Sequence, residues 1–307
     1  MERKVLRIGT RESQLAVWQA NQVKELLDHQ GHEAQLIYIK SEGDIDLQTP
    51  LYEIGVQGIF TRSLDIALLN NRIDLAVHSM KDVPTQMPKG IVQSAVLKRA
   101  SYKDLFVYKG DISFLNDFDS VGVIATSSIR RKAQWLNRYP SHNVVNLRGN
   151  VNTRLRKVAE SDWNGAIFAA AGLDRIGLRP ETSIELDWML PAPAQGAIVV
   201  VCRENDSFSF EASNYFNDTS TAMCTKIEKD FLRILLGGCS TPISALAEIK
   251  HEALLFKGNI FTVDGSERVD IEKAVPILEA EGLGKIAALE ILANGGQVIA
   301  AGIHHER

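Results

Sequence analysis

Short apolar segments, each followed by a polar or amphipathic stretch, recur through the first two thirds of the chain. This alternation is typical of α/β domains whose sheets are mostly parallel. After the first apolar segment, Leu15, Trp18, Val23 and Leu27 recur at mostly helical spacing and stop before Gly31, as expected for a helix with a glycine beyond its last turn. The expected strands span residues 5–10, 33–40, 73–77, 121–125, 144–147, 166–169 and 198–201.

The length of 307 residues suggests two domains, or three small ones, at about 150 residues per domain. Residues 206–220 are polar and have no clear period, so we expect a domain boundary there. A helix over about residues 221–236 follows, then Gly237 and Gly238, then further strands and a late helix near residues 283–293.

The charge balance and the cysteines exclude several classes of protein. The 34 Lys and Arg against 38 Asp and Glu give a net charge of -4, which argues against a protein that coats nucleic acid through bulk positive charge. We expect no membrane span, and the first residues turn polar before any apolar run of signal-peptide length. Three cysteines without metal-ligand spacing argue against a disulfide framework or a zinc site. We therefore expect a cytoplasmic protein with free thiols.

Four of the expected strands end in segments that carry a cation, at residues 10–13, 78–82, 126–131 and 147–154. In a parallel sheet such junctions lie at one edge, outside the carboxyl ends of the strands, where open α/β folds bind ligands. Helix N-termini and hydroxyl groups favour anions there, and arginine adds a planar fork suited to carboxylates or phosphates. The junctions together predict a site for a multiply charged anion.

Taken singly, residues at these junctions also fit structural roles, and these alternatives stay open. Helix capping would account for Ser13, Ser128 and Thr153, and a solvated helix face for Arg130, Arg131, Arg154 and Arg156. A surface ion pair would account for Lys81 and Asp82. A helix stop would account for Gly237 to Cys239, and packing in the core for His78.

Several motifs resemble those of the porphobilinogen deaminase family and occur in that family's order over essentially the whole chain. They are VHSMKDVP at 77–84, TSSIRR at 126–131, LRGNV at 147–151 with Arg154, AGL at 171–173 with Arg175, and Gly238-Cys239 before Pro242. The resemblance implies three domains: two α/β domains resembling type II periplasmic binding proteins, with mainly parallel sheets and the active cleft between them, and a small α/β C-terminal domain. The implied boundaries are 1–98 with a return segment 197–215, then 102–191, then 219–307 carrying the cofactor-attachment cysteine.

The resemblance also implies a reaction. Members of the family join four porphobilinogen molecules head to tail into the linear tetrapyrrole hydroxymethylbilane, with release of ammonia, for porphyrin and haem biosynthesis. They do so on a covalent dipyrromethane cofactor, which by motif match is held by a thioether to Cys239. Cytosolic thiols do not open a thioether as they would a disulfide. The only expected partner is porphobilinogen, for a monomer that binds no nucleic acid, membrane or metal.

By the same resemblance, Asp82 matches the catalytic aspartate, whose carboxylate can stabilise positive charge and assist proton transfer. Each pyrrole of the substrate carries an acetate and a propionate, so a growing chain needs many fixed cations and donors. The residues implied for this task are Arg11, Ser13, Ser79, Lys81, Thr126, Ser127, Ser128, Arg130, Arg131, Arg148, Arg154, Arg175 and Gln195.

The chain also departs from the family pattern. Gln57, in the segment 55–58, lies where the family usually has a lysine in a glycine-containing loop. The segment 193–196 (PAQG) replaces a more usual Val-Gly-Gln-Gly, which keeps Gln195 but stiffens the approach to it.

Two other classes of protein remain open. A small-anion binding protein would need neither Asp82 nor a modified Cys239, and a nucleic-acid binder would be expected to interleave aromatic residues with its arginines.

Overall fold

The computed structural model describes residues 5–40, 61–235 and 241–305 of the chain. The chain divides into two compact units, and each is described here by itself. Unit 1 comprises the described residues of Met1–Leu47, Val56–Ala100 and Gly196–Met223. Unit 2 comprises those of Ser101–Gln195 and Cys224–Arg307.

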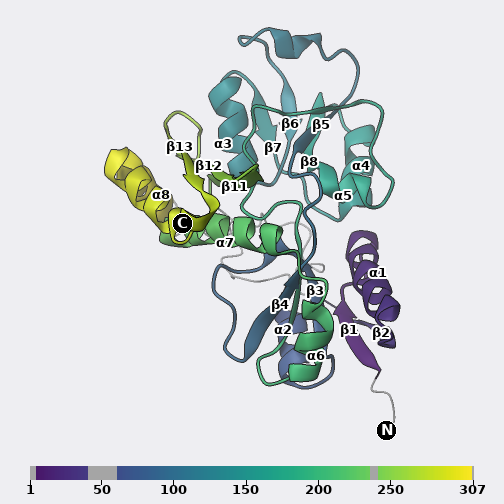
Figure 1. The fold of residues 1–307 in the computed structure, drawn as a ribbon. Coiled ribbons are helices and arrows are strands. Elements are labelled where there is room, and N and C mark those ends of the chain that lie inside the picture. The colour runs from purple at the N-terminus through teal and green to yellow at the C-terminus, as the bar shows by residue number, and fades with distance from the viewer. Residues whose placement is uncertain (1–4, 41–60, 236–240, 306–307) are drawn as a thin grey trace. The chain divides into compact units, whose positions relative to one another are not determined.

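Unit 1 is built on a five-stranded sheet of order β2-β1-β3-β10-β4, as far as the described residues show (Figure 1). β1 pairs in parallel with β2 and β3, whereas β10 is antiparallel to both β3 and β4. Four strands therefore point one way and β10 points the other. The strands are β1 (Leu6–Thr10), β2 (Ala34–Tyr38), β3 (Leu75–Ser79), β4 (Ile91–Val96) and β10 (Ile198–Arg203). The helices are α1 (Gln14–His29), α2 (Arg62–Leu69), the single turn η2 (Met80–Asp82) and α6 (Ser207–Asn214).

Helix α1 shows how local sequence positions the elements of unit 1. Ser13 begins the helix, and the helix ends just before Gly31, whose φ of 79° is a conformation that favours glycine. Its apolar face, with Ala20, Val23 and Leu27, packs into the same core as β1 and β3. This packing fixes the start of α1 next to the carboxyl end of β1.

Unit 2 contains a second five-stranded sheet, of order β7-β6-β8-β5-β9 within the described residues. β6 is parallel to β7 and β8, and β5 is antiparallel to β8 and β9, so again one strand runs against four. The strands are β5 (Asp104–Tyr108), β6 (Val123–Ala125), β7 (Asn143–Val145), β8 (Gly165–Ala169) and β9 (Ser183–Glu185). The helical segments are η3 (Ser113–Asn116), α3 (Ile129–Arg138), α4 (Val151–Glu160) and α5 (Ala170–Asp174).

A smaller three-stranded antiparallel sheet, β11-β12-β13, completes unit 2. Phe231, Phe256 and Ala287 belong to the core between this sheet and its helices. The elements are α7 (Thr219–Ile234), which begins within unit 1, β11 (Ile243–Lys250), β12 (Ala253–Phe261), β13 (Arg268–Pro276), η4 (Ile277–Glu279), α8 (Leu283–Ile291), the π-helical turn η5 (Leu292–Gly296) and α9 (Gln297–His305).

The stretch Leu283–Ile303 is long and apolar enough to cross a membrane by length and composition, with a mean hydropathy of 1.5. It is not one straight helix, because Asn294 and Gly295 have non-helical backbone angles in η5. Its residues Ala287, Ala288 and Ile291 are fully buried in the core with β12. One face of this stretch therefore packs in the core of unit 2, while Ile286, Leu289 and Val298 are exposed.

The predicted fold class is confirmed: the chain is α/β, with mainly parallel strands in its two large sheets and a small α/β C-terminal part. Each of the seven expected strands corresponds to an observed one. Residues 206–220, expected to be irregular, instead contain α6 and the start of α7. The three-domain division at 1–98 with 197–215, 102–191 and 219–307 stays a prediction, since the small sheet lies in the same compact unit as the second large one.

Candidate active site

The predicted site residues of unit 1 lie at one edge of its sheet. β1 and β3 are parallel neighbours, so the segments that follow them share the edge at their carboxyl ends. Arg11 and Ser13 follow β1, and Ser79 ends β3. Lys81 and Asp82 follow in η2, and both side chains are half-buried. Unit 1 therefore presents two cations, two hydroxyls and one carboxylate at this edge.

Helix α1 holds the two hydroxyl residues of this edge. Ser13 caps the helix, with its Oγ accepting from the backbone N–H of Ala16 at 3.4 Å. The buried side chain of Gln19 donates from Nε2 to Ser79 Oγ at 2.9 Å, a contact that sequence reasoning missed. The cap interpretation of Ser13 is thus confirmed, and α1 orients Ser79 through Gln19.

His78 lies directly before these residues and is buried in the sheet. Its Nε2 has no hydrogen-bond partner among the described residues. Burial, with a smaller contribution from the positive charge of Arg11, lowers the pKa of His78 to about 4. His78 is therefore a packed, neutral histidine at neutral pH, although the hydrogen bond expected for its packed form is absent at Nε2.

The corresponding edge of unit 2 carries the second group of predicted residues. Thr126, Ser127 and Ser128 follow β6, and Ser128 caps α3 by accepting from Arg131 N at 3.4 Å. Ser127 Oγ accepts from Leu147 N at 3.0 Å, which ties the segment after β6 to the one after β7. Thr126 Oγ1 accepts from Ser128 N at 3.2 Å. The three hydroxyl residues therefore organise the turns from which the arginines of this edge extend.

The arginines after β7 and β8 are at least partly buried. Arg148 follows β7 and is 4% exposed. Arg154, on the first turn of α4, donates from Nε to Gly149 O at 2.7 Å. Arg175 follows α5, and burial lowers its pKa to about 10. Arg156, by contrast, has a side chain that is 69% exposed and lies near Glu160, so the solvated-face interpretation holds for Arg156.

Arg130 and Arg131, on the first turn of α3, are buried against Asp104 at the start of β5. Arg130 Nη2 donates to Asp104 Oδ2 at 2.7 Å. Arg131 donates to Asp104 Oδ1 from Nη2 at 2.7 Å and from Nε at 3.1 Å. The solvated-face alternative is therefore wrong for this pair.

Gln195 belongs to the same buried cluster and is 1% exposed. Its Nε2 donates to Asp104 Oδ1 at 2.9 Å and to the backbone oxygen of Tyr102 at 2.8 Å. We call Asp104, Arg130, Arg131 and Gln195 the Asp104 cluster. Sequence reasoning missed Asp104, although a lone carboxylate at the head of the apolar segment Leu105–Val107 is a signal that a cation must pair with it.

The structure thus places the predicted residues in two groups, one at an edge of each unit. Arg11, Ser13, Ser79, Lys81 and Asp82 belong to unit 1, and the predicted residues from Thr126 to Gln195 belong to unit 2. Cys239 and Gln57 lie outside the described residues.

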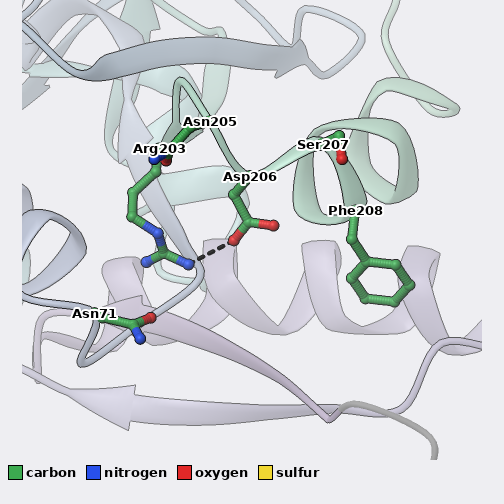
Figure 2. A pocket seen from close by; sticks show the side chains of 6 residues that line it. All are labelled: Asn71, Arg203, Asn205, Asp206, Ser207 and Phe208. Carbon is green, nitrogen blue, oxygen red and sulfur yellow. Dashed lines mark hydrogen bonds and ion pairs between the residues drawn. The ribbon is translucent and has the colours of Figure 1, made fainter. Parts of the chain in front are cut away.

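A cavity of about 480 Å³ lies in unit 1 near the opposite end of β3 from Ser79. Figure 2 shows the ion pair between Arg203 and Asp206 in its wall, with Asn71 and Phe208 beside it. Arg203 Nη2 also reaches Asp74 at 3.0 Å, and its Nη1 donates to the backbone oxygens of Leu68 and Ile73. Both Nη atoms of Arg203 are thus occupied by acceptors of the protein, which disfavours anion binding in this cavity.

Comparisons with known proteins agree with these observations. The family model described as "Porphobilinogen deaminase, dipyromethane cofactor binding domain" matches residues 6–211. The model described as "Porphobilinogen deaminase, C-terminal domain" matches residues 222–293.

Curated relatives match over nearly the full length. The porphobilinogen deaminase of Syntrophotalea carbinolica is 39% identical over 307 residues, which cover 99% of this chain and 97% of the relative. That of Geobacter sulfurreducens is 40% identical over 303 residues, which cover 97% and 95%. Among solved structures, the periplasmic VFT2 domain of Bordetella pertussis BvgS is similar at 13% identity and a TM-score of 0.43, covering 69% of this chain and 87% of that one. The sequence matches decide the assignment: the chain belongs to the porphobilinogen deaminase family.

Proposed function

We propose that this chain polymerises porphobilinogen with Asp82 as its catalytic carboxylate, Cys239 as the attachment point of its cofactor, and the cations of both sheet edges as binders of substrate and cofactor carboxylates. Membership of the family makes the chain a hydroxymethylbilane synthase, a transferase of porphyrin biosynthesis that joins four porphobilinogen molecules and releases ammonia. Its cofactor is dipyrromethane, the group named for the domain that matches residues 6–211.

The observation that carries the binding part of the proposal is the charge of the Asp104 cluster. Two guanidinium groups surround one carboxylate, so this buried group of side chains has an excess of one positive charge. Uncompensated buried charge is costly, and a carboxylate would neutralise it. Porphobilinogen and dipyrromethane both carry carboxylates on every ring, so the residues present fit the chemistry of both.

Asp82 is proposed as the catalytic group because the reaction develops positive charge. Loss of ammonia from the aminomethyl group of porphobilinogen leaves a cation, and a fixed carboxylate nearby stabilises it. The Asp82 carboxylate can also accept a hydrogen bond from the pyrrole N–H and assist removal of the proton lost when the new bond forms. Lys81, its neighbour in η2, can bind a substrate carboxylate on the same edge.

The bound dipyrromethane supplies the primer to which the substrate units are added. We propose Cys239 as its attachment point on the motif Gly238-Cys239 before Pro242. The other two cysteines, Cys202 and Cys224, are buried and not disulfide-bonded within the described residues, and burial raises the pKa of Cys202 to about 11. A thiol held protonated in this way is a poor nucleophile, which disfavours Cys202 as the attachment point.

We also propose that the enzyme acts as a cytoplasmic monomer without a nucleic-acid or membrane partner. The net charge of -4 supports this, since it disfavours binding to phosphate-rich surfaces except at local clusters of cations.

The test of the proposed function is porphobilinogen turnover by Asp82→Asn. We expect the variant to retain the covalent cofactor and to bind substrate, but to lose most of its turnover, at least about a hundredfold. The matched control is Asp28→Asn, because Asp28 is exposed on α1 of the same unit and, within the described part of the chain, its carboxylate pairs only with Lys24 across one helical turn. Near-normal turnover by Asp82→Asn contradicts the catalytic role. If the wild-type chain binds porphobilinogen without consuming it, the protein is a small-anion binding protein instead.

A further inference from the structure

Asp104 is the buried carboxylate on which Arg130 and Arg131 converge, and the proposed function gives it no role. Its side chain is 0% exposed, and the side chains of Arg130 and Arg131 are 5% and 7% exposed. Burial alone would raise the pKa of Asp104, but the two guanidinium groups outweigh that effect and hold the pKa well below its usual range. Asp104 is therefore ionised under all ordinary conditions.

The contacts of the two arginines leave part of each guanidinium group available. Arg130 also donates from Nη1 to Leu190 O at 2.7 Å, and Arg131 from Nη1 to Ile167 O at 3.0 Å. Together with the bonds to Asp104, these contacts use two of the five N–H groups of Arg130 and three of those of Arg131. The Nε of Arg130 is buried without a partner among the described residues. Both side chains are thus fixed in direction while they keep donors for another acceptor.

Asp104 is itself held by Gln195. The two hydrogen bonds from Gln195 Nε2, to Asp104 and to the backbone of Tyr102, hold the carboxylate against the start of β5. An amide in this position neutralises no charge, but it orients Asp104 Oδ1, the atom that accepts both bonds from Arg131.

The turn that carries Gln195 is strained and is held by a second buried carboxylate. Ala194 has a φ of 63°, a conformation that is unfavourable for an L-residue other than glycine. Its N–H donates to Glu228 Oε2 at 2.6 Å, and the other oxygen of Glu228 accepts from Ala247 N at 2.7 Å. Glu228 is fully buried on α7 and so joins the turn at Ala194 to β11.

We propose that Asp104 is a positioning residue that aligns the guanidinium groups of Arg130 and Arg131 for a substrate carboxylate, and that Glu228 supports it through the turn at Ala194 and Gln195. This inference rests on the proposed function. When the two guanidinium groups are already fixed, binding a carboxylate costs no further conformational entropy of two long side chains. Loss of this alignment therefore weakens substrate binding more than it slows the chemical step.

The experiment compares Asp104→Asn with Asp74→Asn in the full chain. Asp74 is the matched control because it is also a buried aspartate between two arginines, Arg7 and Arg203, but it lies away from the proposed site. We expect Asp104→Asn to raise the KM for porphobilinogen about tenfold or more, with a much smaller change in kcat, and to lower the fraction of chains that carry the cofactor. Asp74→Asn should lower thermal stability to a similar degree without shifting KM.

A second variant keeps the inference testable if Asp104→Asn fails to fold. Glu228→Gln keeps the shape of the side chain but replaces one acceptor oxygen by a donor, so it can no longer accept from both Ala194 and Ala247. We expect a smaller rise in KM, about threefold, again with kcat nearly retained.

Equal KM values for the Asp104, Glu228 and Asp74 variants, measured on folded protein, would overturn the positioning role while leaving the proposed function intact. If the wild-type chain consumes no porphobilinogen, the proposed function fails and the positioning role fails with it. A KM that shifts only in the Asp104 and Glu228 variants supports the inference.

Discussion

Each of the two units buries an aspartate between two arginines, and the two clusters differ in their net charge. In unit 1, Arg7 and Arg203 converge on Asp74, and Asp206 adds a second carboxylate that pairs with Arg203. In unit 2, Arg130 and Arg131 converge on Asp104, and no second carboxylate of the described residues is among their hydrogen-bond partners. Charges therefore balance in the first cluster, whereas the second retains one positive charge.

This difference separates a structural ion-pair network from one suited to a ligand. The balanced cluster satisfies Arg203 with carboxylates and backbone oxygens, so an added anion would find few donors. The two arginines of the unbalanced cluster lie on the first turn of α3, where the N-terminal N–H groups of the helix also favour an anion. Similar side chains thus have different roles because of one additional acid.

The largest effect should come from removing one arginine of each cluster. Arg131→Met should abolish cofactor assembly or reduce porphobilinogen turnover by at least about a hundredfold, because it removes a guanidinium group proposed to bind carboxylates. Arg203→Met should retain turnover per folded molecule. Arg203→Met should lose about 3–5 kcal/mol of stability, since it leaves one carboxylate of its cluster without a partner charge. Arg131→Met should lose less, because Asp104 stays paired with Arg130. Turnover normalised to folded protein distinguishes them, and an equal loss in both variants would remove the distinction between the clusters.

Acid should reveal the contribution of Asp104 to the stability of unit 2. The pKa of Asp104 is lower in the folded chain than in the unfolded chain, so its stabilising effect is fully present above about pH 5 and is lost as pH falls towards the folded pKa. The free energy of unfolding of the wild type should therefore exceed that of Asp104→Asn most at pH 7, and the difference should shrink below pH 5. Denaturant unfolding at a series of pH values measures it. A difference that does not vary with pH would contradict the ionised assignment.

Unit 1 should also respond to acid in a different pH range, because His78, one of its buried titratable groups, is a base. The pKa of His78 is lowered to about 4, so the stabilising effect of the neutral ring is present above pH 6.5 and is lost as pH falls to 4. Over this range the wild type should lose about 3 kcal/mol of stability relative to His78→Gln. Hydrogen exchange in β3 and β10, followed from pH 7 to pH 4, locates the effect. Loss of protection confined to values below pH 4 would contradict it.

The smallest effects should come from two loop residues with positive φ, one in each unit. Ala194 and Asn71 both have positive φ values, of 63° and 55°. Ala194→Gly should relieve strain and raise stability by less than about 1 kcal/mol, because the greater flexibility of unfolded glycine offsets part of the gain. Asn71→Gly should destabilise by about 1 kcal/mol, since asparagine tolerates this conformation and its Oδ1 accepts from Arg7 Nη2 at 3.0 Å. Thermal unfolding of both variants tests the opposite signs.

The sequence predicted seven strands of the two large sheets and the polar segments that follow them, because apolar runs and strand-end polar residues are local signals. It missed β4, β5 and β9 of the same sheets. It also anticipated that Ser13 and Ser128 could cap helices, since a cap lies within a few residues of the helix it begins. Thr153 was a wrong cap candidate, as Asn150 begins α4 and its Oδ1 accepts from Thr153 N.

The partners of the arginines could not be predicted in the same way. Asp104 precedes Arg130 by 26 residues, and the two meet only because β5 pairs antiparallel with β8 inside the sheet. β5 was not among the expected strands, so nothing in the local pattern placed its first residue beside α3. The same holds for Glu228, which reaches the turn at Ala194 from 34 residues away.

The central claim is that the chain holds a covalent dipyrromethane on Cys239, and the intact mass of the purified full-length protein tests it most directly. The account predicts a mass excess equal to one dipyrromethane, located on the peptide that contains Cys239, lost in Cys239→Ala and retained in Cys224→Ala. An active chain with the mass of the unmodified sequence, or an excess mapped to another residue, would contradict it.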